Sequence, residues 1–364
     1  MANYVNTPEG LQRCLAAMAT TDDVALDTEF HPERSYFPRL MLVQLRPREG
    51  EAWLVDPVPG LDLRPLGAAL SARRLIAHGA TADLQILARV ANLRPGRVFD
   101  TQVAAGLLGY GYPTRLGIVL REIIGRDIAK HETMSDWSTR PLHPDQLRYA
   151  AEDVLWLHAA ADRLQARVDE GGKGEILRGL MDEQLAQILA DPEDQAVWRS
   201  MPAALALEPH ERAPAQALAA WRERVARERD QPRQNVLADA AILDLARRSP
   251  TTLEGIGNNR RLSPALIRRD GPAILAVLAA AAAAPAPDAA PYRDRLWTDL
   301  VRLAARVAER QTGAAAELTL GGDTVSRLAR GQPLEPWRQE ALGEWFFGFL
   351  AGNSSITIRD ARMT

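Results

Sequence analysis

Two carboxylates two residues apart are the first side chains in this chain whose spacing suggests a chemistry. Asp27 and Glu29 follow the apolar run at residues 24–26, which predicts a buried strand. Side chains alternate between the two faces of a strand, so Asp27 and Glu29 point to one side and Thr28 to the other. Two like charges held side by side repel unless a cation or a proton lies between them. The pair therefore predicts either a site for a hard metal ion or an acid/base pair.

A third carboxylate follows a later apolar run. Residues 75–77 are apolar, and Asp83 falls in the first turn of the helix predicted after them. Negative charge is favoured at that position by the helix dipole, so Asp83 is equally consistent with an acid that only stabilises a helix start. Asp100 precedes another predicted helix, and helix capping is the favoured interpretation for it.

A tyrosine and two acids lie on a helix further along the chain. Tyr149 and Asp153 are four residues apart and therefore share a helix face. Glu152 lies only slightly further round the helix, so the spacing alone does not choose between the two acids. A tyrosine four residues before an aspartate is common on any helix, and this pair carries weight only in combination with the other acids.

The elements that must position these acids alternate between strand and helix patterns. Short apolar runs predict strands at residues 24–26, 41–45, 52–55 and 75–77. Helical periodicity is clear at residues 8–17, 81–90, 100–108, 116–124 and 144–164. Strands gathered early and helices alternating later predict an α/β domain with a mixed sheet. Beyond about residue 175 we expect helices and no strand.

Composition limits the class of protein. A chain of 364 residues with 46% hydrophobic and 25% charged residues is typical of a globular protein with two or three domains. The N-terminus lacks a secretory signal pattern, and no uncharged apolar run reaches membrane-spanning length. Cys14 is the one cysteine, which excludes a disulfide within the chain and a cysteine-based zinc site. We therefore expect a cytoplasmic protein.

Charge is distributed unevenly. The net charge is −3, but residues 212–270 contain twelve arginines against seven acidic residues. Lys130 and Lys173 are the only lysines, so nearly all the positive charge is guanidinium, which suits bidentate contacts with phosphate. The basic segment predicts a contact with nucleic acid, although a solvated charged face with Glu–Arg pairs such as Glu223 and Arg227 is the plain alternative.

Taken together, the acid pair, the acid at a helix start and Tyr-x-x-x-Asp resemble the DEDD family of 3′→5′ exonucleases in its tyrosine subtype. The intervening segments resemble ribonuclease D more specifically, and the resemblance covers residues 1–165. They are Ser35-Tyr36-Phe37-Pro38-Arg39-Leu40, Leu42-Val43-Gln44-Leu45, Val98-Phe99-Asp100-Thr101-Gln102 and Asp136-Trp137-Ser138-Thr139-Arg140-Pro141-Leu142. The chain departs from the family at His31-Pro32-Glu33, where proline restricts the backbone and the fit of the substrate is put in doubt.

The resemblance implies an RNase H-like exonuclease domain and two divalent ions, Mg²⁺ or Mn²⁺, per active site. It makes Asp27, Glu29, Asp83 and Asp153 the metal ligands, with Asp27 bridging both ions. Two such ions about 4 Å apart activate water and neutralise the charge that develops on the phosphate. Tyr149 would orient the attacking water, because a tyrosine with a pKa near 10 is a poor base at neutral pH.

Further residues are candidates for contacts with the substrate. In the nuclease part they are Phe30, Gln44, His78, Lys130, Trp137 and Arg140. Stacking on the terminal base is the role open to Phe30, with packing in the core as the alternative. A structural role at the end of its strand is the alternative for His78, and a solvated surface is the alternative for the 130–140 loop.

The helical second half resembles the HRDC module of RecQ-type helicases and ribonuclease D. Its arginine-rich helix, including Arg222 and Arg229, would follow a phosphate backbone. A second, more divergent HRDC-like domain is expected at the C-terminus. The predicted units are a nuclease domain at 1–170, a helical connector at 171–207, an HRDC domain at 208–284, a linker at 285–291 and the second helical domain at 292–364.

The predicted function is that of a 3′→5′ exoribonuclease that trims precursor tRNA 3′ ends and small structured RNAs and releases 5′-monophosphates. We expect a monomer with no obligate protein partner and no membrane contact. A DNA exonuclease of the same fold stays open, because no motif reads the 2′-hydroxyl. A catalytically inactive scaffold that binds nucleic acid is the other alternative, but such a scaffold has no reason to keep four mutually repelling acids.

Overall fold

The structure is a computed structural model, and most of the chain is described by it. The described residues are 2–31, 35–57, 60–127, 136–190, 197–201, 207–282, 295–321, 323–356, 358–359 and 362–363. Within them, no helix is both long enough and apolar enough to cross a membrane. Lys130, Pro32 with Glu33, and the predicted linker at 285–291 lie outside the described residues.

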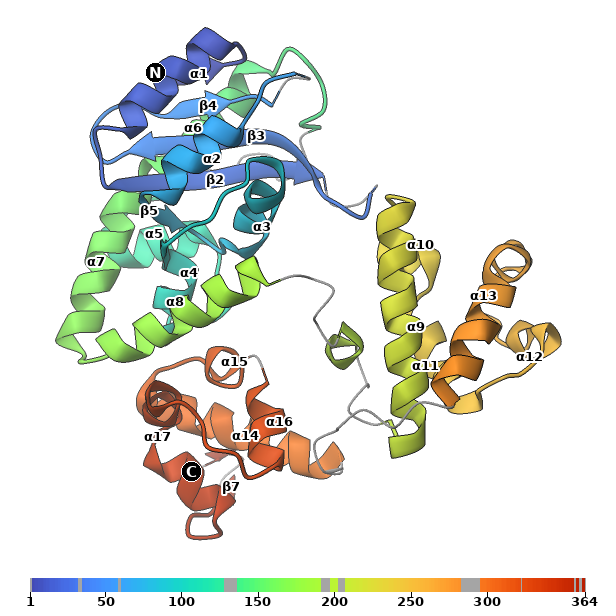
Figure 1. The fold of residues 1–364 in the computed structure, drawn as a ribbon. Helices are drawn as coiled ribbons and strands as arrows, with labels where there is room; N and C mark the ends of the chain where they lie inside the picture. The colour runs from blue at the N-terminus through green and yellow to red at the C-terminus, as the bar shows by residue number, and fades with distance from the viewer. Residues whose placement is uncertain are drawn as a thin grey trace.

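A six-stranded mixed sheet forms the centre of the N-terminal domain (Figure 1). The strand order is β1-β4-β3-β2-β5-β6, in which β2 pairs antiparallel with β3 and parallel with β5. The predicted α/β class with a mixed sheet is confirmed. The strands are β1 (Asn3–Val5), β2 (Asp23–His31), β3 (Arg39–Pro47), β4 (Trp53–Val55), β5 (Arg74–Ala77) and β6 (Arg97–Asp100).

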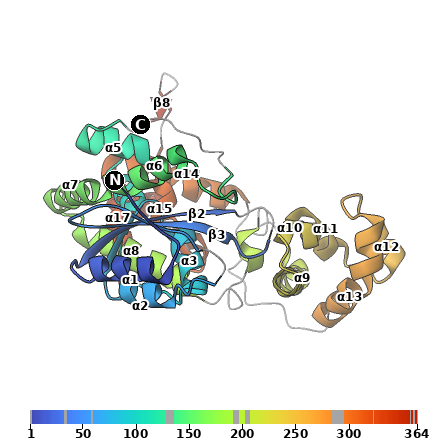
Figure 2. The ribbon, with the colours of Figure 1, turned by 90° about the horizontal axis from the view of Figure 1, so that it is seen from above.

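Helices cover both faces of this sheet (Figure 2). One face packs on helices α1 (Pro8–Met18), α2 (Arg64–Ser71) and α3 (Thr81–Val90). The other face packs on α4 (Thr101–Leu107), α5 (Leu116–Ile124), α6 (Pro144–Leu155), α7 (Leu157–Glu170) and α8 (Gly174–Leu189). Buried apolar side chains of β2 and β3 point alternately to the two faces of the sheet and pack on the helices of both layers. Both strands therefore contain continuous apolar runs in the sequence.

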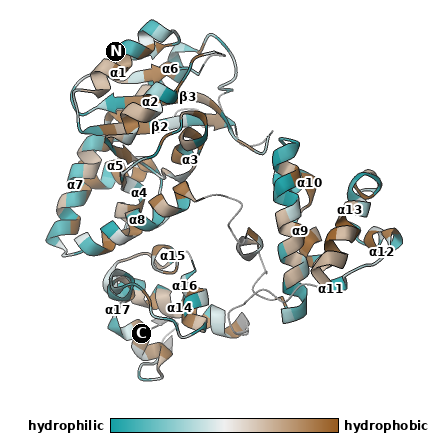
Figure 3. Ribbon diagram, viewed as in Figure 1, coloured by the Kyte–Doolittle hydropathy of each residue, from teal (hydrophilic) through white to brown (hydrophobic). Residues whose placement is uncertain are grey.

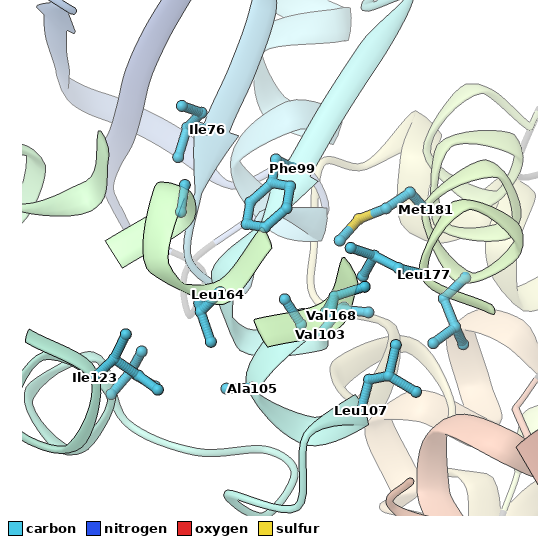
Figure 4. Close-up of a cluster of buried hydrophobic side chains, with 14 of the residues drawn as sticks. Ile76, Phe99, Val103, Ala105, Leu107, Ile123, Leu164, Val168, Leu177 and Met181 are labelled. Carbon is cyan, nitrogen blue, oxygen red and sulfur yellow. The ribbon is translucent and has the colours of Figure 1, made fainter. Parts of the chain in front are cut away.

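Two hydrophobic clusters hold the layers together. In Figure 3 the hydrophobic residues of β2 and β3 lie between helices with hydrophilic outer surfaces. Figure 4 shows part of the cluster on the second face, where Ile76 and Phe99 of the sheet meet Leu164 of α7 and Met181 of α8. This packing fixes the strand ends that carry the acids.

The predicted elements are largely confirmed, with three differences. The helix predicted at 144–164 is two helices, because Trp156 breaks the α-helical geometry between α6 and α7. Strands β1 and β6 were not predicted because polar residues interrupt them, and helix α2 was not predicted either. The prediction of no strand beyond about residue 175 is wrong for two pairs of residues, β7 (Ile358–Arg359) and β8 (Arg362–Met363).

Apart from β7 and β8, the regular elements described in the rest of the chain are helices, and they form two further clusters of buried residues. The first helical domain follows the short 3₁₀ helix η1 (Val197–Ser200) and comprises α9 (Pro209–Glu228), α10 (Arg233–Val236), α11 (Asp239–Arg248), α12 (Leu253–Gly257) and α13 (Pro264–Ala282). The second comprises α14 (Arg295–Thr312), α15 (Ala316–Thr319), α16 (Thr324–Ala329) and α17 (Pro336–Leu350). This agrees with the predicted order of one α/β domain followed by helical domains.

Candidate active site

The acid pair lies within β2, at the fifth and seventh of its nine residues, beside β3 of an antiparallel pair. Asp27 is directly opposite Gln44 of β3, and Glu29 is opposite Leu42. The register shifts immediately after Glu29, as at a β-bulge, which locally increases the twist of the strand. The face that carries Asp27 and Glu29 is the face covered by α6.

Helix α6 brings a third carboxylate to this pair. Its N-terminus is fixed by a capping box between His143 and Gln146 and by Pro144 in the first turn. Carboxylate oxygens of Asp27, Glu29 and Asp153 all lie within 4.8 Å of one another. Three convergent carboxylates are the ligand set that Mg²⁺ and Mn²⁺ prefer, so these residues fit a divalent metal site.

Asp83 lies next to the three-carboxylate cluster but is held differently. It is a buried residue of the first turn of α3 and accepts a hydrogen bond from the hydroxyl of Thr28. Its charge is close enough to raise the pKa of Asp27 and of Glu29. Asp83 is therefore poised at the edge of the cluster, with Thr28 orienting its carboxylate.

The turn before α3 is anchored by Asp100. Its carboxylate accepts hydrogen bonds from the backbone N–H of Gly79 at 2.9 Å and of Ala80 at 2.8 Å. It also caps α4 by accepting from the N–H of Gln102 at 2.9 Å, so the capping predicted for Asp100 is observed. The Asp100 carboxylate therefore sets the position at which α3 begins, and with it the position of Asp83 in the first turn.

Burial and mutual repulsion shift the pKa of every acid in the site upward. Burial raises the pKa of Glu29 to about 8, with the charges of Asp153 and Asp83 adding to the effect. Burial likewise raises the pKa of Asp153 to about 7 and that of Asp83 to about 6. The pKa of Asp27 is raised by burial and then by its three acidic neighbours. Four acids with raised pKa values at one place indicate a site built for a cation.

Tyr149 lies one helical turn before Asp153 and faces the same cluster. Burial, followed by the charges of Asp153 and Glu29, raises the pKa of Tyr149 further above its ordinary value. Its phenol is within hydrogen-bonding range of Asp153, and its ring lies 6.2 Å from that of Trp137, centroid to centroid. A neutral phenol in this position can donate or accept a hydrogen bond but cannot act as a strong base at neutral pH. Glu152, which spacing alone left as an alternative, is not in the three-carboxylate cluster.

Two of the predicted substrate contacts lie on the hairpin of the acid pair. Phe30 is partly buried and packs against the core under α1, α2 and α3, as its alternative interpretation expects. Gln44 is fully buried, and neither its amide oxygen nor its amide nitrogen has a hydrogen-bond partner. A buried amide without partners is costly, so Gln44 is a polar group kept beside Asp27 rather than an exposed contact for a nucleotide.

Three other predicted contacts have structural partners. Both ring nitrogens of His78 are occupied, Nδ1 by the hydroxyl of Thr101 and Nε2 by the backbone oxygen of Thr114, each at 2.9 Å. This supports the structural alternative for His78, and burial lowers the pKa of its ring. Trp137 is 6% exposed and packs in the cluster under α6.

Arg140 clamps its loop to the sheet, although 33% of its side chain remains exposed. It pairs with the buried carboxylate of Asp56 and donates to the backbone oxygens of Met41 and Trp137, at 2.9 and 2.7 Å. These bonds tie the loop before α6 to the edge of β3. The solvated surface expected as the alternative for this loop is wrong for Trp137, which is buried, whereas Arg140 is exposed. Lys130 lies outside the described residues.

The two arginines predicted to bind RNA from the first helical domain are engaged within it. Arg222 is 2% exposed and pairs with Asp239 and Glu223. Arg229 is paired through both terminal nitrogens with Asp270, at 3.2 and 2.7 Å. The prediction that Arg222 contacts RNA is wrong in this structure because helix periodicity places it on the inner face of α9. Exposed arginines of the same domain include Arg260 and Arg268.

The motifs do not identify three further residues of the site, which are Thr28, Asp56 and, as an anchor of α3, Asp100. Thr28 lies between the two acids of the first motif but on the other face of the strand, which is why it reaches Asp83. Asp56 directly follows β4 and is 2% exposed. An acid directly after a short apolar run is the one signal in the sequence that could have identified Asp56.

Known proteins share both parts of this architecture. Residues 2–169 match the family model described as 3′-5′ exonuclease, and residues 211–278 match the HRDC domain. The chain is 33% identical to ribonuclease D of Acidiphilium cryptum over 99% of this chain and 95% of that protein. It is 31% identical to ribonuclease D of Pseudomonas paraeruginosa over 88% of this chain and 90% of that protein.

A solved structure agrees with these relatives over nearly the whole chain. The crystal structure of Escherichia coli RNase D, described as an exoribonuclease involved in structured RNA processing, superposes with a TM-score of 0.78. It is 26% identical, and the match covers 98% of this chain and 100% of that one. Together with the carboxylate cluster and Tyr149, these likenesses show that the chain belongs to the ribonuclease D family of metal-dependent 3′→5′ exoribonucleases.

Proposed function

We propose that this exoribonuclease removes nucleotides from RNA 3′ ends at the site formed by Asp27, Glu29, Asp83 and Asp153, and that each cut releases a 5′-monophosphate. The observation that carries the proposal is the convergence of three carboxylates within 4.8 Å between β2 and α6, with Tyr149 on the same helix face as Asp153. The natural substrates we propose are precursor tRNA 3′ ends and other small structured RNAs, in the cytoplasm, with the protein as a monomer.

The carboxylates would hold two divalent ions, Mg²⁺ or Mn²⁺, which lower the pKa of bound water and neutralise charge on the phosphate when they are present. Asp27 would be central in holding these ions, because it lies among the other three acids. Thr28 orients the carboxylate of Asp83 by donating a hydrogen bond to it from its hydroxyl.

Tyr149 would position the attacking water through its phenol, because its raised pKa keeps the hydroxyl protonated. The ring of Trp137 beside it and the clamp formed by Arg140 and Asp56 limit the freedom of α6 and of the loop before it. Gln44 would support Asp27 from the neighbouring strand. The roles of Phe30, His78, Trp137, Arg140, Arg222 and Arg229 are then supporting ones within the fold.

The family matches at residues 2–169 and 211–278 support a division of the chain into a nuclease domain at 1–170, a connector at 171–207, an HRDC domain at 208–284, a linker at 285–291 and a second helical domain at 292–364. The match to the E. coli enzyme covers 98% of this chain. The C-terminal domain would complete the surface around the nuclease site.

The test is a nuclease assay with Mg²⁺ or Mn²⁺ against a chelator on matched single strands of RNA and DNA. We expect activity on RNA that disappears with the chelator and falls at least about a hundredfold in Asp27→Ala and in Asp153→Ala, as for loss of a metal ligand. Glu152→Gln is the matched control on the same helix and keeps its activity. Activity that survives chelation, or a preference for DNA, would contradict the proposal.

A further inference from the structure

The hairpin that carries the acid pair reaches beyond the sheet to the first helical domain. Strands β2 and β3 extend toward α9 and α10 in both views of the molecule (Figures 1 and 2). The contacts between this hairpin and the helical domain converge on Tyr36 and Phe37, which precede β3. We call these residues, with Glu223 and Asp230 of the helical domain, the hairpin contact.

Tyr36 is inserted against the helical domain. Its hydroxyl lies 3.0 Å from a carboxylate oxygen of Glu223 and donates a hydrogen bond to it. Its ring packs on the hydrophobic core of that domain. Glu223 is only 5% exposed and is held by Arg233 at 2.8 Å. The acceptor for the tyrosine is therefore a buried carboxylate that also has an arginine partner.

Asp230 holds the backbone of the same turn. Its carboxylate accepts from the N–H of Tyr36 at 3.1 Å and from that of Phe37 at 3.3 Å. Asp230 follows the end of α9 with φ +46°, the left-handed conformation in which glycine is preferred after a helix. A side chain at this position is unfavourable for the helix end by itself, and the bonds to the hairpin explain its presence.

Guanidinium groups surround the contact. The Arg227 and Arg233 groups lie 5.6 and 5.5 Å from the ring centroid of Tyr36. On the nuclease side, the guanidinium of Arg89 lies 4.1 Å from the ring centroid of Phe37. A chain of phosphates that leaves the acid pair along the hairpin would meet these cations where the two domains join.

We propose that Tyr36 and Asp230 are specificity-determining residues, which fix the first helical domain to the acid-pair hairpin so that RNA long enough to reach that domain is held for cleavage. The proposal rests on the exoribonuclease function. A dinucleotide occupies only the carboxylate site and does not need the contact. A longer RNA needs the nuclease domain and the first helical domain to be held in a fixed relative position.

The decisive variant is Asp230→Gly in the full chain, because glycine relieves the left-handed strain while it removes both bonds to the hairpin. Ser249→Gly is the matched control, since Ser249 is left-handed at φ +41° after α11 in the same domain. Hydrogen exchange of the peptide that contains Tyr36 and Phe37 should quicken about tenfold in Asp230→Gly and stay unchanged in Ser249→Gly. Unchanged exchange in both variants would overturn the contact.

Steady-state kinetics test the proposed role of the hairpin contact in substrate specificity. For an RNA hairpin with a single-stranded 3′ tail, Asp230→Gly should raise KM about tenfold, whereas kcat on a dinucleotide stays at the wild-type value. Tyr36→Phe keeps the ring and should show a smaller rise in KM. Equal loss on both substrates, or no loss on the long RNA, would overturn the specificity role. A wild-type protein inactive on both would contradict the proposed function instead, and the exchange experiment would still decide the contact.

Discussion

At the scale of single residues, the site is an arrangement of groups that repel one another. Asp27 lies among three acids that all raise its pKa. The Thr28 hydroxyl donates a hydrogen bond to Asp83 and partly offsets the repulsion. Gln44 adds a fully buried amide without a partner. Such local conflict is expected where function, and not stability, selects the residues. It predicts that the protein without metal is less stable when the acids are ionised.

The stability of the metal-free protein should therefore fall as the pH rises. Glu29 has a pKa of about 8 in the fold against an ordinary value of 4.5, and Asp153 about 7 against 3.8. The folded state thus binds more protons than the unfolded state between about pH 4 and 8, and in that window the free energy of unfolding decreases as pH increases. Thermal unfolding in EDTA at a series of pH values measures this slope.

The matched comparisons are Glu29→Gln, which should flatten the slope, and wild type with Mn²⁺. Carboxylates must lose their protons to bind the ion, so the increase in melting temperature on adding Mn²⁺ should grow with pH. A metal-free protein that becomes more stable across this pH range would contradict the assignment of the raised pKa values to the carboxylate cluster.

At the scale of elements, buried polar side chains hold the ends of strands and helices in place. Asp100 ends β6, caps α4, anchors the turn before α3 and accepts from Gln184 of α8 at 2.7 Å. Arg140 with Asp56 does the same for the loop before α6. The elements that carry Asp83 and Asp153 are thus each positioned by a different buried group at the edge of the sheet.

We expect Asp100→Ala to lower the free energy of unfolding by about 2–4 kcal/mol, because it leaves several buried donors without an acceptor. Urea unfolding monitored by circular dichroism measures the loss. Asp100→Asn keeps one oxygen for the N–H groups of Gly79 and Gln102 and should lose less. Equal stability of wild type and Asp100→Ala would show that the anchor is dispensable.

At the scale of the whole molecule, the two helical domains are attached in different ways. The second domain shares the core of the nuclease domain, where Ala315 and Leu318 join the cluster around α4 and α7. Arg338, 3% exposed, pairs with Glu183 of α8. Each helical domain also has a hydrophobic cluster of its own, but the first domain meets the nuclease through the hairpin contact. The second domain is therefore part of the folding unit of the nuclease, and the first is a separately folded module.

A substitution in α8 tests this difference. A methyl group at Gly179 would lie 2.4 Å from the ring of Trp337, so Gly179→Ala should push α17 away and lower the free energy of unfolding by about 1–3 kcal/mol. Gly174→Ala is the control in the same helix, because its nearest neighbour would be 3.9 Å away and alanine favours a helix. Urea unfolding of both variants gives the comparison, and equal stability would contradict the shared core.

The sequence by itself determined the fold class, most of the helices and strands, and the acids and tyrosine of the site. Strand and helix periods are local properties, so they place Asp27 and Glu29 on one face of a strand and Tyr149 with Asp153 on one face of a helix. Strands β1 and β6, which polar residues interrupt, leave no such period and were missed. The break at Trp156 was missed because the segments on both sides of it are helical and together show one helical period.

Only the tertiary structure decided which polar side chains face the site and which are bound to partners within the fold. Arginine and histidine are residue types that suggest a contact with phosphate. In this fold, however, each of Arg222, Arg229, Arg140 and His78 is bound by a partner distant in sequence or lies on the inner face of a helix. The same long-range packing brings Thr28 to Asp83 and Tyr36 to Glu223. A side chain's availability depends on its neighbours in space, and no local pattern in the chain records them.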